Sequence, residues 1–346
     1  MTAANLDATN LNDAARGGVI NEDVMQKIWE IDNIPLPFTE KCSDTTSGNA
    51  FKEFTIDELG DSSTDNAHVD GADVEQDDSA VGTRVGNYHQ TAVKEIQVST
   101  RANASNTIGR QGSLSYQVAK GQKKLRRDVE SQMCTQQASV AGDGLTVPGI
   151  SAGIGAWIET NVDRGATGAS GGFNTTTGLI DAPTPGTPRA LSEESIRDVA
   201  QLVYEAGGKT EYLMSTPQVI RLMSEYLFTD AARVATMTND GATGTSPMKA
   251  YGSANVFISD FGQILKFMDN RLQKPDDTNV ASLYFLDPAH LYQSFLTGYR
   301  TEPLGKTGLS DKRLISVDYS LLVTNEKSQG VIADINTATP MIAENA

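Results

Sequence analysis

The sequence predicts an α+β fold, in which one long helix packs against a long late strand beside a compact body of helices and strands. Three observations predict it. Apolar residues recur at helical spacing from Asn106 to Gln137, and β-branched residues mark strands both before that stretch and from Leu314 to Val323. Helix and strand patterns also follow one another between residues 191 and 290. Since every amphipathic element must bury its apolar face, we expect the late strand to pack beside the long helix.

Composition and charge exclude several classes of protein. The 346 residues include 44 acidic and 28 basic side chains, and the net charge of -16 argues against general affinity for nucleic acid backbones. No run approaches 18 apolar residues, and the N-terminus lacks the apolar core of a signal peptide, so we expect neither membrane insertion nor secretion. Cys42 and Cys134 lie far apart in the chain, and we interpret both as ordinary thiols.

The N-terminal region, residues 1–50, is predicted to be an arm. Its one apolar-periodic piece, Val19 to Ile31, is too small to form a core, so the arm should be ordered by packing on something else, such as another copy of the chain. Residues 51–101 are predicted to form a two-stranded excursion. Phe51 to Leu59 and Thr83 to Thr100 both have strand character.

An acidic segment separates these two strands. No Lys or Arg occurs from Glu53 to Thr83, whereas nine acidic residues follow Glu53, namely Asp57, Glu58, Asp61, Asp65, Asp70, Asp73, Glu75, Asp77 and Asp78. Such a block is usually a solvated loop. The alternative is a ligand set, which would make the chain a metal-dependent enzyme that uses residues 57–78. The spacing does not match a calcium-binding loop, so the sequence predicts no metal here.

The long helix has two distinct faces. Ser105 can cap its start, and some thirty residues would span roughly 45 to 50 Å. Gly121 costs about 1 kcal/mol relative to Ala inside a helix, so its position predicts that another backbone packs closely there. The apolar face consists of Leu114, Val118, Gly121, Leu125, Val129 and Met133. The opposite face carries Lys120, Lys123, Lys124 and Arg127.

Residues 102–150 are therefore predicted to form a central domain built on this helix. The following stretch, residues 151–190, belongs to a region rich in Gly, Thr and Pro that starts near Val140. We predict that it is a long surface loop, interrupted by an apolar piece from Gly153 to Val162.

The compact body is predicted at residues 191–290. Ser192 should cap a helix that ends at Ala206-Gly207-Gly208, a strand should follow at Tyr212 to Ser215, and Pro217 should begin a second helix. Asn255 to Ile258 and Ile264 to Met268 predict a hairpin. The last strands, Leu283 to Leu286 and Leu314 to Val323, are expected to complete one mixed sheet. Residues 291–325 should return to the long helix, and residues 326–346 should end the body and form the tail.

Motifs for catalysis or cofactor binding are absent from the sequence. His68, His89 and His290 have no partner at metal-binding spacing, and His68 and His290 are interpreted as surface or capping residues. Gly305-Lys306-Thr307 resembles the end of a phosphate-binding loop, but Arg300 stands where that motif needs Gly. The sequence thus predicts no enzyme, no cofactor and no metal site.

Two interpretations of the basic helix face remain open. It is either a solvated surface or a contact for carboxylates. Our hypothesis is that the acidic excursion of one subunit lies near the basic face of its neighbour and aids assembly. Exposed pairs contribute only about 0 to 1 kcal/mol each and are screened by salt, so several would have to act together. The candidate contact residues are Asp70, Asp73, Glu75, Asp77, Asp78, Lys120, Lys123, Lys124 and Arg127.

The order of arm, two-stranded excursion, long helix, compact body and returning strand resembles the Hong Kong 97-type major capsid proteins of tailed phages. The local sequence resembles most the podophage-type major capsid family first catalogued as a domain of unknown function. The resemblance covers roughly residues 50–335. Five collinear stretches carry it: Thr83 to Tyr88, Lys123 to Glu130, Ala156 to Asn161, Tyr204 to Gly208, and the tail from Leu304 through Asn325-Glu326-Lys327 to Ile332.

This resemblance implies a fold and a role. The excursion would be the E-loop, the long helix the spine of the P-domain, and the body the A-domain. Hexamers and pentamers of the chain would close into an icosahedral virion shell around double-stranded DNA, which the acidic chain would hold only weakly. The implied partners are a portal protein, a separate scaffolding protein and a decoration protein, with assembly in the host cytoplasm. The alternative with the same fold is an encapsulin-like nanocompartment shell.

Overall fold

The computed structural model describes residues 35–57, 82–105, 113–227, 256–306 and 308–343, together with positions 64, 67–71 and 73. Most of the predicted arm lies outside these residues, as do the first residues of the predicted long helix, 106–112. Within the described residues, no helix is long and apolar enough to cross a membrane.

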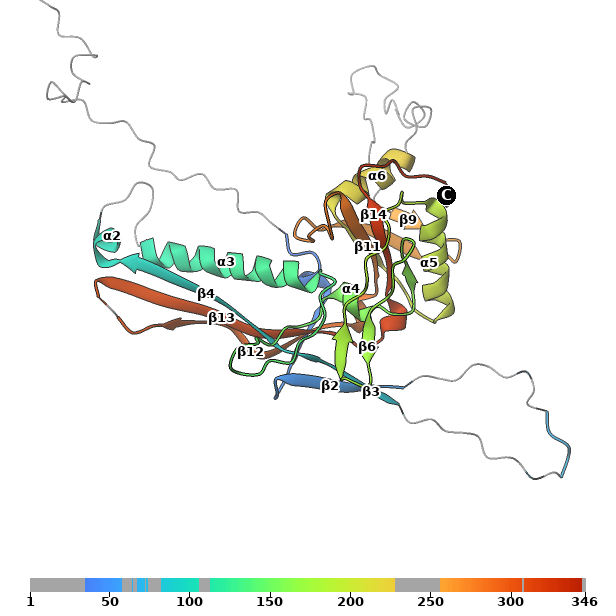
Figure 1. The fold of residues 1–346 in the computed structure, drawn as a ribbon, viewed down its shortest axis with the longest axis horizontal. Coiled ribbons are helices and arrows are strands. Elements are labelled where there is room, and N and C mark those ends of the chain that lie inside the picture. The colour runs from blue at the N-terminus through green and yellow to red at the C-terminus, as the bar shows by residue number, and fades with distance from the viewer. Residues whose placement is uncertain are drawn as a thin grey trace, which may run out of the picture.

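Two separate sheets organise the molecule. The first has the order β1-β12-β13-β4 and the second the order β5-β14-β11-β8-β10-β9. Figure 1 shows the first sheet as a long platform beneath helix α3, and the second as an upright body flanked by α5 and α6. The first consists of β1 (Ser43–Thr46), β4 (Gln90–Ser99), β12 (Leu291–Pro303) and β13 (Ser310–Val323). The second consists of β5 (Val162–Asp163), β8 (Tyr212–Ser215), β9 (Val256–Ile258), β10 (Ile264–Asp269), β11 (Val280–Leu286) and β14 (Gly330–Asn336).

The prediction of one mixed sheet is therefore wrong. The strand predicted at Leu314 to Val323 pairs with β4 and β12, whereas the strand predicted at Leu283 to Leu286 lies in the other sheet. Strand patterns reveal which face of a strand is buried, but they do not name the pairing partner, so they could not separate the two sheets.

Helix α3 (Ser113–Met133) lies along β4 and β13, as predicted for the long helix and the late strand. Its buried residues include Gly121, Leu125, Val129 and Met133, which confirms that part of the predicted apolar face. A Cβ atom at Gly121 would collide with the side chains of Ile96 and Ile315. The close approach predicted at Gly121 is thus made by side chains and not by another backbone.

The predicted end of the long helix needs correction. Helix α3 ends at Met133 rather than at Gln137, and the next residue, Cys134, is buried. Ser105 is the C-cap of a short helix, α2 (Thr100–Ala104), which Ser99 caps at its start. Because residues 106–112 lie outside the described residues, the start of the long helix after Ser105 stays a prediction.

The predicted excursion is confirmed as a hairpin. Strand β2 (Phe51–Ile56) pairs antiparallel with β3 (Thr83–Tyr88), from Phe51 opposite Tyr88 to Ile56 opposite Thr83. The second predicted strand, Thr83 to Thr100, is in fact two strands. The chain changes partner at His89, and β4 then leaves the hairpin to pair with β13.

The prediction of a surface loop over residues 151–190 is wrong for its first part. Residues 151–158 are all buried, and they contain the short helix α4 (Ile154–Trp157). A small hairpin, β6 (Gly172–Asn174) and β7 (Leu179–Asp181), packs beside it and buries Ile180. Since this stretch is buried on every side, it shows no amphipathic period that would have identified it as core.

The predicted body is confirmed element by element. Ser192 caps α5 (Glu193–Glu205) by accepting a hydrogen bond from the Ser195 N–H, and the helix ends before Gly207, whose φ is +80°. Helix α6 (Pro217–Leu227) begins at the predicted proline. Strands β9 and β10 form the predicted hairpin, which turns through Gly262. Three short 3-10 helices complete the described elements, namely η2 (Thr39–Lys41), η3 (Pro288–His290) and η4 (Glu326–Ser328).

Candidate functional site

A buried carboxylate joins the base of the arm, helix α3 and the six-stranded sheet. Glu130, near the end of α3, has an exposed fraction of 0%. Its carboxylate accepts hydrogen bonds from the backbone N–H of Phe38 at 2.9 Å and of Thr39 at 2.8 Å, and also from the Thr39 hydroxyl. Asn270, which follows β10, donates from Nδ2 at 2.8 Å. One side chain therefore fixes three parts of the chain that are far apart in sequence.

Sequence reasoning did not identify Glu130. It lies three residues before Met133 and so borders the apolar face of the helix, but an acidic residue at such a border is ordinarily solvated. Its donors come from residues 91 and 140 positions away, which no helical pattern reveals.

A second joint holds the root of the β2–β3 hairpin. The Asn87 side chain donates to the Leu321 carbonyl at 2.7 Å and accepts from the Ala152 N–H at 3.2 Å. Ser151 adds to this joint, because its hydroxyl accepts the Leu321 N–H at 3.1 Å. The fully buried Asn87 therefore connects β3, the 151–158 segment and β13.

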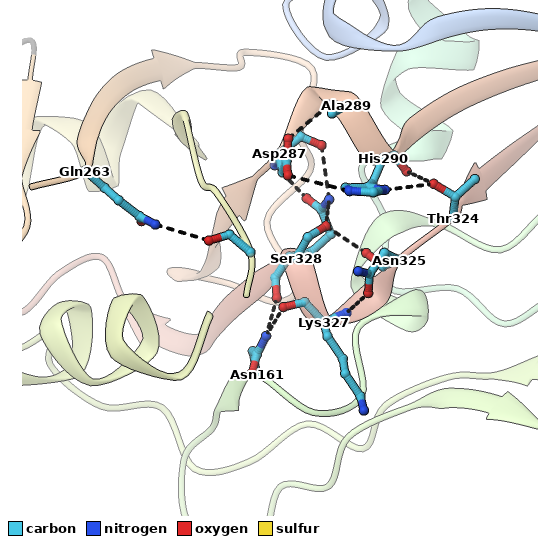
Figure 2. A network of polar contacts seen from close by, with 11 residues as sticks. Asn161, Gln263, Asp287, Ala289, His290, Thr324, Asn325, Lys327 and Ser328 are labelled. Carbon is cyan, nitrogen blue, oxygen red and sulfur yellow. Dashed lines mark hydrogen bonds and ion pairs between the residues drawn. The ribbon is translucent and has the colours of Figure 1, made fainter. Parts of the chain in front are cut away.

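A third joint connects the two crossings, which are the segments by which the chain passes from one sheet to the other (Figure 2). One crossing runs from β11 through η3 to β12, and the other from β13 through η4 to β14. The Gln329 side chain accepts the Asp287 N–H at 2.9 Å and donates to the Asp287 carbonyl at 3.1 Å. Asn161 donates to the carbonyls of Lys327 at 2.6 Å and Gln329 at 3.0 Å. These bonds fix how the upright body meets the platform.

The predicted basic face is part of a larger basic surface. A cavity of about 540 Å³ between α3 and β4 is lined by Lys94, Lys120 and Lys124, among other residues. A neighbouring cavity of about 380 Å³ adds Arg127, Arg271 and Lys274. Lys94 pairs with Asp128 at 2.5 Å. The sequence identified the helical stripe, but it could not show that β4 and the loop after β10 extend it.

The predicted contact residues fall into three groups. Lys123, Lys124 and Arg127 are exposed on α3, and Lys120 is half-buried. Asp70 and Asp73 are exposed. Glu75, Asp77 and Asp78 lie outside the described residues. The contact between acidic and basic residues of different copies stays a prediction.

The histidines and cysteines differ in their surroundings. His68 is exposed. The Nδ1 atom of His290 lies 3.1 Å from the hydroxyl oxygen of Thr324. His89 is buried, and desolvation lowers its pKa below the ordinary 6.5. Both cysteines are free thiols, and burial raises the pKa of each. Within the described part of the chain, no three His, Cys, Asp or Glu side chains form a group that could hold a metal ion.

A further cavity lies at the Ile56–Thr83 end of the β2–β3 hairpin, opposite the end that Asn87 fixes. It measures about 340 Å³, and Trp157 and Val85 contribute to its walls together with Glu159 and Glu326. Together with the basic surface and the three joints, this pocket completes the scaffold that the described residues form.

A family comparison decides what kind of protein carries this scaffold. The family model described as the SU10 major capsid protein matches residues 2–336 of the chain. The chain belongs to this family of phage major capsid proteins. The predicted resemblance to tailed-phage major capsid proteins is confirmed.

Relatives and solved structures agree with this membership. The chain is 23% identical over 324 residues to the major capsid protein of Escherichia phage Phieco32, covering 86% of this chain and 89% of that one. A structure from Gordonia phage Cozz is similar with a TM-score of 0.57 at 13% identity, covering 99% of this chain and 98% of the other. The capsid protein therefore has the predicted α+β fold of the Hong Kong 97 type.

An encapsulin structure shares this fold. The SrpI encapsulin complex of Synechococcus elongatus PCC 7942 is similar with a TM-score of 0.54 at 9% identity, covering 96% of this chain and 98% of the other. At such low identity the likeness shows the fold alone. The family match favours the phage capsid over the nanocompartment shell, and it places the chain among structural proteins.

Proposed function

We propose that this capsid protein assembles as hexamers and pentamers into an icosahedral shell around phage double-stranded DNA. The observation that carries the proposal is the arrangement of a stiff platform, a projecting hairpin and an arm base, all fixed by buried joints, in a chain of the capsid family. Such a subunit closes by repeated heterologous contacts.

The elements receive the roles that the resemblance implied. We assign residues 1–50 to the arm, 51–101 to the E-loop and 102–150 to the P-domain with its spine helix. Residues 151–190 connect to the A-domain at 191–290, the P-domain returns at 291–325, and 326–346 end the A-domain and form the tail. The long strand β13, which lies beside α3 and pairs with β12, supports this division.

The acidic hairpin segment and the basic surface are proposed to meet between copies. The basic surface gathers Lys94, Lys120, Lys124, Arg127, Arg271 and Lys274 along α3. Each exposed pair is weak and screened by salt. Several such pairs repeated over a shell would favour correct encounters more than they stabilise the fold.

The accessory partners are proposed from the family resemblance. A portal protein would occupy one vertex, a separate scaffolding protein would guide assembly in the host cytoplasm, and a decoration protein would bind the outside. Packaged DNA would be held weakly, because the subunit carries a net charge of -16.

Co-expression with a candidate scaffolding protein tests the proposal. Electron microscopy and sedimentation of the product should show closed icosahedral particles, and particles purified from infected cells should contain DNA. Particles that enclose a cargo enzyme would favour the nanocompartment instead. A chain that stays a monomer over a wide range of salt and protein concentration would overturn both.

A further inference from the structure

The pocket at the Ile56–Thr83 end of the hairpin combines an apolar floor with an acidic rim. Val85, Trp157 and Val323 are buried and form its floor, and its rim carries the carboxylates of Asp57, Glu159 and Glu326. None of the described residues that line it is Lys or Arg. Three acidic side chains and no basic one therefore occur among the described residues that line this cavity of about 340 Å³.

Two of the carboxylates are held close together. Glu326 accepts hydrogen bonds from the backbone N–H of Glu159 at 3.2 Å and of Thr160 at 3.3 Å, and from the Thr160 hydroxyl at 3.0 Å. The pKa of Glu159 is raised by burial first and by the charge of Glu326 second. The folded subunit thus keeps a like-charge repulsion that an incoming cation would relieve.

The apolar floor of the pocket favours one kind of cation over another. The rings of Trp157 and Phe173 line the pocket, and Phe54 stacks on Trp157 from outside the lining, at 6.2 Å between ring centroids. Lysine and arginine bury an aliphatic stem against such surfaces while their charged ends reach carboxylates. A bare metal ion would leave the apolar floor unused. The complementary occupant is a basic side chain.

We propose that, in the assembled shell, a lysine or arginine of a second copy of this chain occupies the pocket. The inference rests on the proposed function, which brings copies side by side. Charge complementarity favours a second copy, because the same chain exposes Lys124, Arg127, Arg271 and Lys274 on one surface.

Occupancy would have a mechanical consequence. Asp57 and Val85 belong to the hairpin or directly follow one of its strands, whereas Trp157 belongs to α4 and Glu326 to η4. A basic side chain between them would bind the hairpin to α4 and η4 and fix the angle at which the hairpin projects. Binding of a neighbouring copy in the pocket would therefore fix the position of the hairpin.

Photo-crosslinking in assembled particles tests the proposal. A benzoylphenylalanine placed at the exposed rim residue Thr175 is irradiated in shells assembled from a mixture of ¹⁴N- and ¹⁵N-labelled full chains, and the crosslinked peptides are identified by mass spectrometry. We expect mixed-label crosslinks to a peptide of the same chain that contains Lys or Arg. The substitutions Glu159→Gln and Asp57→Asn should each lower the crosslink yield by about fivefold. Asp198→Asn, an exposed acid on α5, is the matched control and should leave the yield unchanged.

The outcomes separate the two proposals. Intact shells with crosslinks only within one copy, only to another protein, or none at all would overturn the pocket inference and leave the shell function standing. Unchanged yields in Glu159→Gln and Asp57→Asn would overturn it as well. If the unsubstituted chain forms no particles with its scaffold, the shell function fails and the inference fails with it.

Discussion

The platform and the hairpin of this capsid protein differ in the contacts that hold them in place. In the platform, β12 and β13 pair over most of their length, and α3 buries its apolar face against β13 and β4. The hairpin β2–β3 is a separate two-stranded sheet, which contacts β13 through the bond from Asn87 to the Leu321 carbonyl and contacts α4 through the stacking of Phe54 on Trp157. Two-stranded ribbons alone are marginally stable. We infer that the platform supplies the stability of the subunit, whereas the hairpin can adapt to a neighbouring copy.

The largest effect on the platform should follow from loss of the Glu130 joint. Glu130→Ala leaves the N–H groups of Phe38 and Thr39 and the amide of Asn270 without their acceptor, so we expect the free energy of unfolding to fall by roughly 3 kcal/mol. Urea denaturation measures it. Glu95→Gln, on the exposed side of β4, is the control and should change stability by less than about 0.5 kcal/mol. Equal stability of the two variants would contradict the role of the joint.

Overpacking between the helix and its sheet should come next. Gly121→Val places atoms where Ile96 and Ile315 already lie, and we expect a loss of about 1 to 3 kcal/mol. Ala119→Val puts the same side chain on the exposed side of α3. Thermal unfolding should therefore show a clear loss for position 121 and a change of at most about 0.5 kcal/mol for position 119. A comparable loss at both positions would contradict the packing explanation, because Val has a higher helix propensity than Gly but a lower one than Ala.

The root of the hairpin should give a smaller, pH-dependent effect. His89 has a folded pKa below its unfolded value of 6.5 because burial disfavours the charged ring. The unfolded chain therefore binds more protons in the window between the two values, and stability should rise with pH through that window and be lost as pH falls below 6.5. Stability curves of His89→Gln should lack this dependence, whereas the exposed His68→Gln should keep it. If both variants keep the pH dependence of the unsubstituted chain, burial of His89 is not the cause of the loss of stability below pH 6.5.

The smallest effect on the fold should come from the basic surface, although assembly should change. Replacing Lys124 and Arg127 with Gln should alter the free energy of unfolding by less than about 0.5 kcal/mol, since both side chains are exposed. We expect the yield of particles, measured by light scattering, to fall and to lose part of its salt dependence. Replacement of Arg197 and Arg221, exposed on α5 and α6, is the matched control. Assembly that is insensitive to salt in every variant would remove the charge-pairing proposal.

The sequence predicted those parts of the fold that carry a local signal. The cap at Ser192, the proline at the start of α6 and the apolar face of α3 depend on neighbours a few residues away, and each was found. Sheet membership, the burial of residues 151–158 and the partners of Glu130 depend on contacts between distant segments. No period in the sequence encodes them.

The candidate site divides in the same way. The basic stripe on α3 was visible as a helical pattern, but the pocket at the Ile56–Thr83 end of the hairpin was not. Its rim joins Asp57, Glu159 and Glu326, which come from three separate parts of the chain. Only the folding of β13 beside the hairpin brings them together, and a lone glutamate in sequence gives no sign of such a partner.

A cryo-EM reconstruction of particles formed by the chain tests the central claim most directly. We expect a shell in which each subunit keeps the platform with α3 along β13 and extends its β2–β3 hairpin onto a neighbouring copy. A reconstruction or solution structure in which the hairpin folds back onto its own body, with its acidic segment enclosing an ion or a small molecule, would contradict it.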